Sequence, residues 1–180
     1  MGRLITVGHG TLDRAGLATL LSGATVELLV DVRRFPGSRH NPDVGSDQMA
    51  EWLPEAGIDY RWEERLGGRR RRDKTAEPDA DSWWRVEAFR AYAAHTRTPE
   101  FLAALDELCD EVGSRDTTAV MCSEAVWWRC HRRLVADAAL LLKGVEVAHL
   151  GHDGRTTPHE PSAGARVVDG LLHYDLPAEA

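Results

Sequence analysis

The densest group of reactive side chains lies in MCSEAVWWRCHRR, residues 121–133. The apolar residues before Cys122 predict a buried strand that ends there, then a loop, then a helix beginning at residue 129 or 130. A helix N-terminus presents free N–H groups and the positive end of the helix dipole, which favour thiolates and anions. This position predicts a lowered pKa for Cys130 and an activated thiolate there.

Nucleophilic catalysis is the chemistry that this stretch suggests. We expect Cys122 or Cys130 to be the nucleophile, with His9 or Glu124 as the acid or base. In the alternative interpretation, Cys122 is a small, buried apolar residue. Cys122 and Arg129 are separated by one residue more than in a Cys-x5-Arg phosphatase loop, so that type of phosphate cradle is not expected.

Two further chemistries use the same cysteines. A zinc site would need about four nitrogen or sulfur ligands, which Cys122, Cys130, His131 and His9 supply only if the fold brings them together. The Cys-x7-Cys spacing is not that of a zinc knuckle, so no cofactor is predicted and zinc is kept as an alternative. A Cys122–Cys130 disulfide is a redox state open to the pair.

A second group of candidate residues would bind an anion. Asp31 interrupts the apolar run VELLVDV, and a buried carboxylate needs a partner, for which Arg33 is the nearest cation. The pair is either purely structural, or Asp31 orients Arg33 towards an anionic ligand. His131 and Arg132 would complete the anion site, with Arg132 expected to be exposed in the first helical turn.

The elements that position these residues alternate between strand and helix. Strands are predicted at 3–8, 26–32, 58–62, 117–121 and 145–150, helices at 12–23, 46–57, 83–95, 99–112 and from 129 or 130 to 142, and a terminal hairpin at 167–176. This order predicts an α/β fold, a single-domain, three-layer, Rossmann-like parallel sheet with helices on both faces. Ligands bind beyond the carboxyl ends of such strands, so we expect the candidate residues around one cleft.

The whole sequence is predicted to form that one domain. Residues 3–151 form the core, and residues 152–180 form a loop and a small hairpin packed on it. Residues 67–82 are polar and without periodicity, and contain Gly67-Gly68 followed by four arginines. They are either a solvated loop or a lid that closes over the anion site on a glycine hinge.

Composition limits the classes of protein. The 180 residues carry a net charge of −7, which argues against non-specific binding of duplex DNA. No apolar run approaches the roughly 18 residues of a membrane span, and no signal peptide or membrane association is expected. Three cysteines form no disulfide framework and suggest a reducing cytoplasm. The expected partner is a small anionic or nucleotide-like ligand, with nucleic acid as an alternative.

Several separated motifs resemble one known family. CSEAVWWRCHRRLVAD is similar to the Cys-x-Glu…Arg-Cys-His-Arg…Ala-Asp signature of the bacterial family catalogued as domain of unknown function 488, and VGHGTLDRAGLATLL, LLVDVRRFPGSRHNP, AGIDYRWEERLGGRR and TPEFLAAL agree in order. The resemblance covers about residues 3–151 and implies one α/β domain with a Rossmann-like three-layer arrangement. It draws attention to His9, Asp31, Arg33, Pro36, Asn41, Gly67, Gly68, Cys122, Glu124, Cys130, His131 and Arg132. Val126-Trp127-Trp128 departs from the family's usual Pro or charged residue.

The sequence thus predicts a small cytoplasmic enzyme, a hydrolase or transferase acting on a nucleotide-like, nucleic-acid or other phosphorylated anion. The alternative is a non-catalytic binding or sensor module that uses the same residues to detect a metal, an oxidant or a nucleotide.

Overall fold

The computed structural model describes residues 2–175 and contains two sheets. The strands are β1 (Arg3–Gly8), β2 (Leu28–Asp31), β3 (Asp59–Trp62), β4 (Thr117–Cys122), β5 (Val147–Leu150), β6 (Thr156–Pro158), β7 (Ala165–Val168) and β8 (Leu171–Tyr174). The helices are α1 (Arg14–Gly23), α2 (Ser46–Glu55), α3 (Glu87–His95), α4 (Pro99–Gly113) and α5 (Arg132–Lys143). Three single 3₁₀ turns cover Pro42–Val44, Glu64–Leu66 and Trp127–Arg129.

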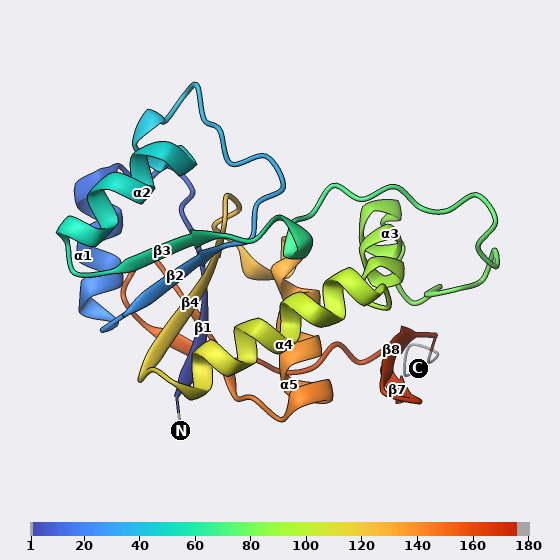
Figure 1. Cartoon of the computed structure of the whole chain (residues 1–180). Helices are drawn as coiled ribbons and strands as arrows, with labels where there is room; N and C mark the ends of the chain where they lie inside the picture. Colours follow the sequence, from blue (N-terminus) through green and yellow to red (C-terminus); the bar gives the residue numbers. More distant parts are fainter. Residues whose placement is uncertain (1, 176–180) are drawn as a thin grey trace.

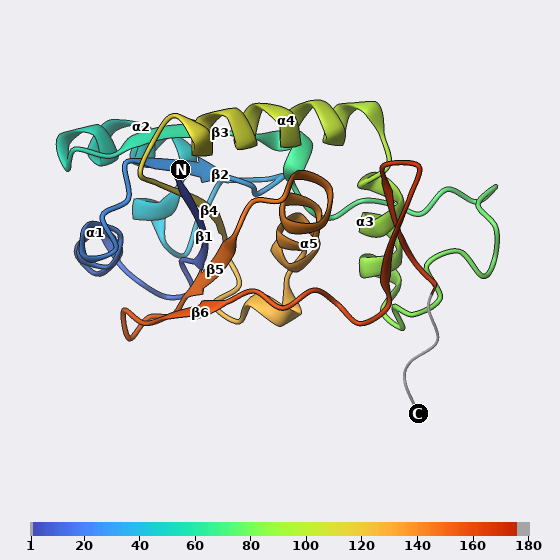
Figure 2. The same ribbon diagram turned by 90° about the horizontal axis from the view of Figure 1, so that it is seen from below.

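The main sheet has the strand order β3-β2-β4-β1-β5-β6 (Figure 1). Its first five strands are parallel, and only β6 runs antiparallel to its neighbour β5. α1 and α2 cover one face, and α4 and α5 cover the other (Figure 2). The fold is therefore the expected Rossmann-like three-layer α/β arrangement.

The central strands are buried on both faces, which explains their continuous apolar runs. Along β1, Leu4 packs in the core beneath α4 and α5, whereas Ile5 and Val7 pack beneath α1 and α2. The same alternation places Leu28 and Leu29 of β2 in opposite cores. Thr6 lies between Ile5 and Val7 in the sequence but points to the α5 side of the sheet. Its side chain is fully buried there and contacts Arg132.

Local sequence signals set several element ends as predicted. Thr98 caps α4 by accepting a hydrogen bond from the Phe101 N–H at 3.2 Å, with Pro99 in the first position. Asp169 and Gly170 both have positive φ and join β7 to β8 in a two-residue turn. Leu176, the last residue of the expected hairpin, and the rest of the segment to residue 180 lie outside the described residues.

Other element boundaries differ from the prediction. α3 begins at Glu87 rather than at Trp83, because the Trp83 N–H donates to the Tyr174 carbonyl and ties that turn to the hairpin. The helix expected from residue 129 or 130 begins at Arg132, after a separate 3₁₀ turn. β6 lies in a segment expected to be loop, since its three exposed residues carry no apolar pattern.

Candidate active site

Cys122 ends β4 at the carboxyl edge of the sheet, beside the end of β1. Gly8 pairs with Cys122 in the parallel register, and the His9 N–H donates to the Cys122 carbonyl at 3.0 Å. The chain leaves β1 towards α1 on one face and leaves β4 towards α5 on the other. Adjacent strands whose connections diverge in this way open a crevice between their ends, which is where parallel sheets bind ligands.

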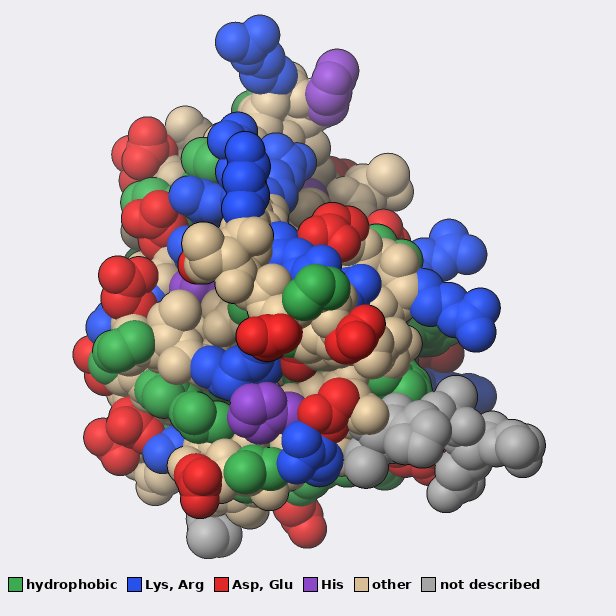
Figure 3. Space-filling model, turned by 90° about the vertical axis from the view of Figure 1, so that its right-hand side faces the viewer, with side chains coloured by type: hydrophobic (Ala, Val, Ile, Leu, Met, Phe, Trp, Pro, Cys, Tyr) green, Lys and Arg blue, Asp and Glu red, His purple; other side chains and the backbone are tan. Residues whose placement is uncertain are grey.

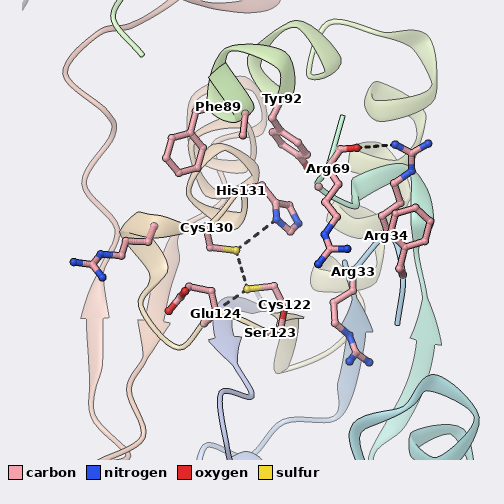
Figure 4. A pocket seen from close by; sticks show the side chains of 14 residues that line it. Arg33, Arg34, Arg69, Phe89, Tyr92, Cys122, Ser123, Glu124, Cys130 and His131 are labelled. Atoms are coloured by element: carbon pink, nitrogen blue, oxygen red, sulfur yellow. Dashed lines mark hydrogen bonds between the residues drawn. The ribbon is translucent and has the colours of Figure 1, made fainter. Parts of the chain in front are cut away.

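The two cysteines of the central motif lie in contact in this crevice (Figure 4). Their Sγ atoms are 2.8 Å apart, and both side chains are buried. Arg132 donates from Nη1 to the Cys122 Sγ at 2.7 Å. Burial would raise the pKa of Cys122, but the hydrogen bond from Cys130 and the charge of Arg132 outweigh it and lower that pKa to about 7. Arg132 and Cys130 therefore both favour the thiolate form of Cys122.

The prediction that Cys130 lies in the first turn of the helix is wrong. Cys130 precedes α5 rather than lying in its first turn, and burial together with the neighbouring Cys122 thiolate raises its pKa well above the ordinary value. His131 Nε2 lies 2.8 Å from the Val32 carbonyl, which can only accept, so Nε2 carries the proton. Burial lowers the pKa of His131 to about 4, leaving Nδ1 as an acceptor 3.5 Å from the Cys130 Sγ.

Arg132 was expected to be exposed, and this too is wrong, because its side chain is only 1% exposed. Its guanidinium donates to Cys122 Sγ, to Thr6 Oγ1 at 3.2 Å, to the Ala125 carbonyl at 3.0 Å and to the Glu124 carbonyl. The loop of residues 123–126 is thus wrapped around the guanidinium. A Cβ on Gly8 would lie 1.8 Å from the Glu124 carbonyl oxygen and 2.6 Å from Arg132 Nη1, so this close approach requires glycine.

His9, Asp31 and Arg33 form a separate polar cluster next to the cysteines. Arg33 makes a bidentate pair with Asp31, with Nε–Oδ1 2.8 Å and Nη2–Oδ2 2.6 Å, and Tyr60 donates to the same carboxylate. Arg33 Nη1 lies 3.3 Å from His9 Nε2, and His9 Nδ1 donates to the Gly10 carbonyl. Burial lowers the pKa of His9, so its ring is neutral and both nitrogens are occupied. These contacts link the ends of β1 and β2 to Tyr60 of β3.

A cavity of about 250 Å³ opens above the thiol pair. Residues from the ends of β2, β3 and β4 and from α3 line it, among them Ser123 and Glu124 beside Cys122, and Phe89 and Tyr92 opposite. In Figure 4 the Arg69 guanidinium lies between His131 and Arg33 and points into this space, whereas the Arg33 guanidinium points away from the cysteines. The arrangement favours Arg69 over Arg33 and Arg132 as the group that meets an anion.

Gly67 and Gly68, expected as a hinge, are buried and close-packed. A Cβ on Gly68 would lie 2.8 Å from His131 Nδ1, and one on Gly67 would lie 2.7 Å from the backbone of Arg34. Glycine at these positions lets the chain after β3 pass against the site. The lid hypothesis for residues 67–82 stays a prediction, with any hinge placed after residue 68.

Sequence reasoning missed a buried polar chain behind the site. Thr6 Oγ1 lies 2.6 Å from His149 Nδ1, His149 Nε2 lies 2.8 Å from His159 Nδ1, and His159 Nε2 lies 2.8 Å from Asp137 Oδ1. Trp127 stacks on His149 with ring centroids 4.0 Å apart, and burial lowers the pKa of His149 to about 3. The available signal was Asp137 itself, a carboxylate inside the apolar helical run LVADAALLL.

The described residues offer neither a metal-binding cluster nor a membrane-spanning helix. Within residues 2–175, no group of three or more His, Cys, Asp and Glu side chains is arranged to hold a metal ion. No helix in that range is long and apolar enough to cross a membrane.

Comparison with known proteins gives one result. The family model described as domain of unknown function DUF488 matches residues 13–139, which is more than half of the chain. No curated protein and no solved structure matches the chain.

Proposed function

The chain belongs to the DUF488 family, and we propose that it is a thiol-dependent enzyme that uses Cys122 as a nucleophile on an anionic substrate. One observation carries the proposal: the Cys122 sulfur, hydrogen-bonded to Arg132 and Cys130, lies at the floor of a cavity into which the Arg69 guanidinium points. Thiolates are the reactive form of cysteine, and guanidinium groups bind phosphate and carboxylate.

The reaction class that fits is group transfer or hydrolysis through a covalent intermediate. An anion held by Arg69 would present its electrophilic centre to Cys122, whose sulfur displaces the leaving group. Water or a second acceptor would then release the transferred group. Glu124 is the one carboxylate among the described residues that line this cavity, so it is the group placed to take the proton from that acceptor.

A redox sensor is the second candidate, favoured by the 2.8 Å distance between the Cys122 and Cys130 sulfurs. A hydroperoxide would oxidise Cys122 to a sulfenic acid, and attack by the Cys130 sulfur would then form the disulfide and release water. Oxidant-dependent loss of two thiols without any reaction with anionic substrates would favour this function. Either function depends on reduced thiols, so we place the protein in the cytoplasm.

The proposal is tested by alkylation with iodoacetamide, followed by mass spectrometry. We expect Cys122 to react fastest, with a half-maximal rate near pH 7, because protonation below that pH removes the thiolate. Burial raises the pKa of Cys109 to about 11, so this half-buried cysteine serves as the slow internal reference. Sulfate or a mononucleotide should protect Cys122, and the variant Arg69→Ala should lose that protection.

Two variants test whether the Cys130 donor lowers the pKa of Cys122. Cys130→Ala removes a donor to the Cys122 sulfur and should shift the half-maximal rate to higher pH, while Cys130→Ser keeps a donor and should shift it less. The proposal would be contradicted if Cys130 were alkylated fastest, or if neither sulfate nor a mononucleotide changed the rate at which Cys122 is alkylated.

A further inference from the structure

We infer that the anionic substrate is single-stranded nucleic acid, held in an arginine-lined groove that leads to Cys122. The inference rests on the proposed function, since it names the substrate class of the same site. It is carried by a second cavity outside the first, by the arginines that line it, and by the exposed aromatic ring between the two.

The second cavity measures about 890 Å³ and adjoins the cavity above the cysteines. Arg34, Phe35 and Arg69 line both, so the two cavities lie side by side and share these three residues. The outer part lies between the chain after β3 and the helix α3. Its volume matches pockets for ligands of roughly 300–1,000 Å³ and greatly exceeds what one phosphate needs.

The outer cavity, which we call the arginine groove, carries positive charge without paired carboxylates. Four arginines line it that make no salt bridge within residues 2–175, namely Arg34, Arg69, Arg70 and Arg71. Arg34 and Arg70 donate only to backbone carbonyls, and the buried Arg34 Nε has no partner within the described chain. The one carboxylate lining the groove, Asp73, is hydrogen-bonded to Thr75.

This concentration of charge is local. The chain as a whole carries −7, yet Lys and Arg side chains gather in the upper half of the face shown in Figure 3. Burial, and after it the charge of the neighbouring Arg34, lowers the pKa of Arg70. A polyanion that neutralises several of them at once would relieve this repulsion.

An exposed aromatic ring stands where the two cavities meet. Phe35 is 62% exposed, and the guanidinium carbons of Arg34 and Arg69 lie 5.5 and 5.9 Å from its ring centroid. An exposed aromatic ring in contact with arginines offers a surface on which a nucleobase stacks while its phosphates meet the cations. Bases of a duplex are not free to stack in this way, and a phosphopeptide has no need of such a platform.

Fluorescence anisotropy with a labelled single-stranded oligonucleotide of about ten nucleotides tests the inference. We expect binding that weakens on the order of fiftyfold between about 50 and 200 mM salt, as four phosphate contacts on a single strand imply. Phe35→Ala should weaken binding about tenfold through lost stacking. Arg71→Ala should weaken it and make it less sensitive to salt.

Matched control variants lie outside the groove. Trp128, 53% exposed, and Arg155, also exposed, line another cavity, so Trp128→Ala and Arg155→Ala should leave binding unchanged. Equal loss in the control variants, equal binding of a duplex of the same length, or stronger competition by a phosphopeptide than by unlabelled single strand would overturn the inference.

Separate measurements test the inference and the proposed function, so the failure of one can be told from the failure of the other. Cys122→Ser should keep the affinity for the oligonucleotide, because Cys122 lines only the inner cavity. In the unmodified protein the oligonucleotide should slow alkylation of Cys122. Oligonucleotide binding that leaves this alkylation unchanged would overturn the inferred link to the thiol, whereas fastest alkylation at Cys130 would overturn the proposed function and leave the groove intact.

Discussion

The reactivity that we propose for Cys122 depends on Arg132, one of the largest fully buried side chains of the described residues. Arg132 contacts the thiol and two carbonyls of the loop that follows it, so it both stabilises the thiolate and shapes the loop. A guanidinium that holds a loop from inside is a positioning residue. It is poorly placed to bind substrate as well.

Replacement of Arg132 should therefore unfold or weaken the protein rather than only remove a ligand contact. We expect Arg132→Ala to lower the free energy of unfolding by about 3 kcal/mol, because it leaves two carbonyls of the loop without their donor and opens a cavity where the side chain was buried. Arg129→Ala, an exposed change in the 3₁₀ turn that follows this loop, should have little effect. Urea unfolding followed by circular dichroism measures both, and an Arg132→Ala variant as stable as Arg129→Ala would refute the positioning role.

At the scale of elements, the segment between β3 and α3 has two parts. Its first residues are packed against the site, and the rest has no regular secondary structure. Gly67 and Gly68 are packed against the site, whereas the backbone hydrogen bonds of residues 73–82 are short local turns. Arg90 of α3 tethers this part by donating to the carbonyls of Pro78 and Ala80. Such a segment can open without disturbing the sheet.

Hydrogen exchange tests this segment as a lid. We expect the amides of residues 69–80 to exchange rapidly in the free protein and to slow when sulfate or oligonucleotide binds, since Arg69, Arg70 and Arg71 would then be held. The exposed turn at residues 152–155 is the reference and should not respond. Full protection of 69–80 without ligand would show a packed structural loop instead.

For the whole molecule, buried neutral histidines couple stability to pH. Burial lowers the pKa of His9, of His131 to about 4 and of His149 to about 3. In the unfolded chain these rings take up protons near pH 6.5, so below that pH the unfolded state binds more protons than the folded one. The free energy of unfolding therefore falls as pH is lowered.

We expect that fall to begin near pH 6.5, to continue to about pH 4 and to amount to a few kcal/mol. Urea titrations at a series of pH values measure it. His149→Gln removes one titrating ring from the buried polar chain and should flatten the dependence, whereas His40→Gln, an exposed change, should not. Constant stability between pH 7 and pH 4.5 would contradict the expectation.

Many of the helices and strands could be predicted from local patterns in the sequence. Continuous apolar runs marked the strands buried on both faces, Thr98-Pro99 marked the start of α4, and Asp169-Gly170 marked the hairpin turn. Each of these signals depends on residues a few positions apart, as do strand and helix periods. The parallel order of strands in turn placed Cys122 at the edge where parallel sheets bind ligands.

The chemistry of the site was decided only in the tertiary structure. Which of Cys122 and Cys130 is ionised depends on where the Arg132 guanidinium reaches, and whether an arginine meets solvent or carbonyls depends on how the loop of residues 123–126 folds around it. Likewise burial holds His131 neutral against the Val32 carbonyl, 99 positions away, whose hydrogen bond alone would raise the pKa of the ring. Desolvation and charge pairing add up over neighbours in space, so residue type and spacing alone predicted which residues lie together at this edge but not the hydrogen bonds and charges around each of them.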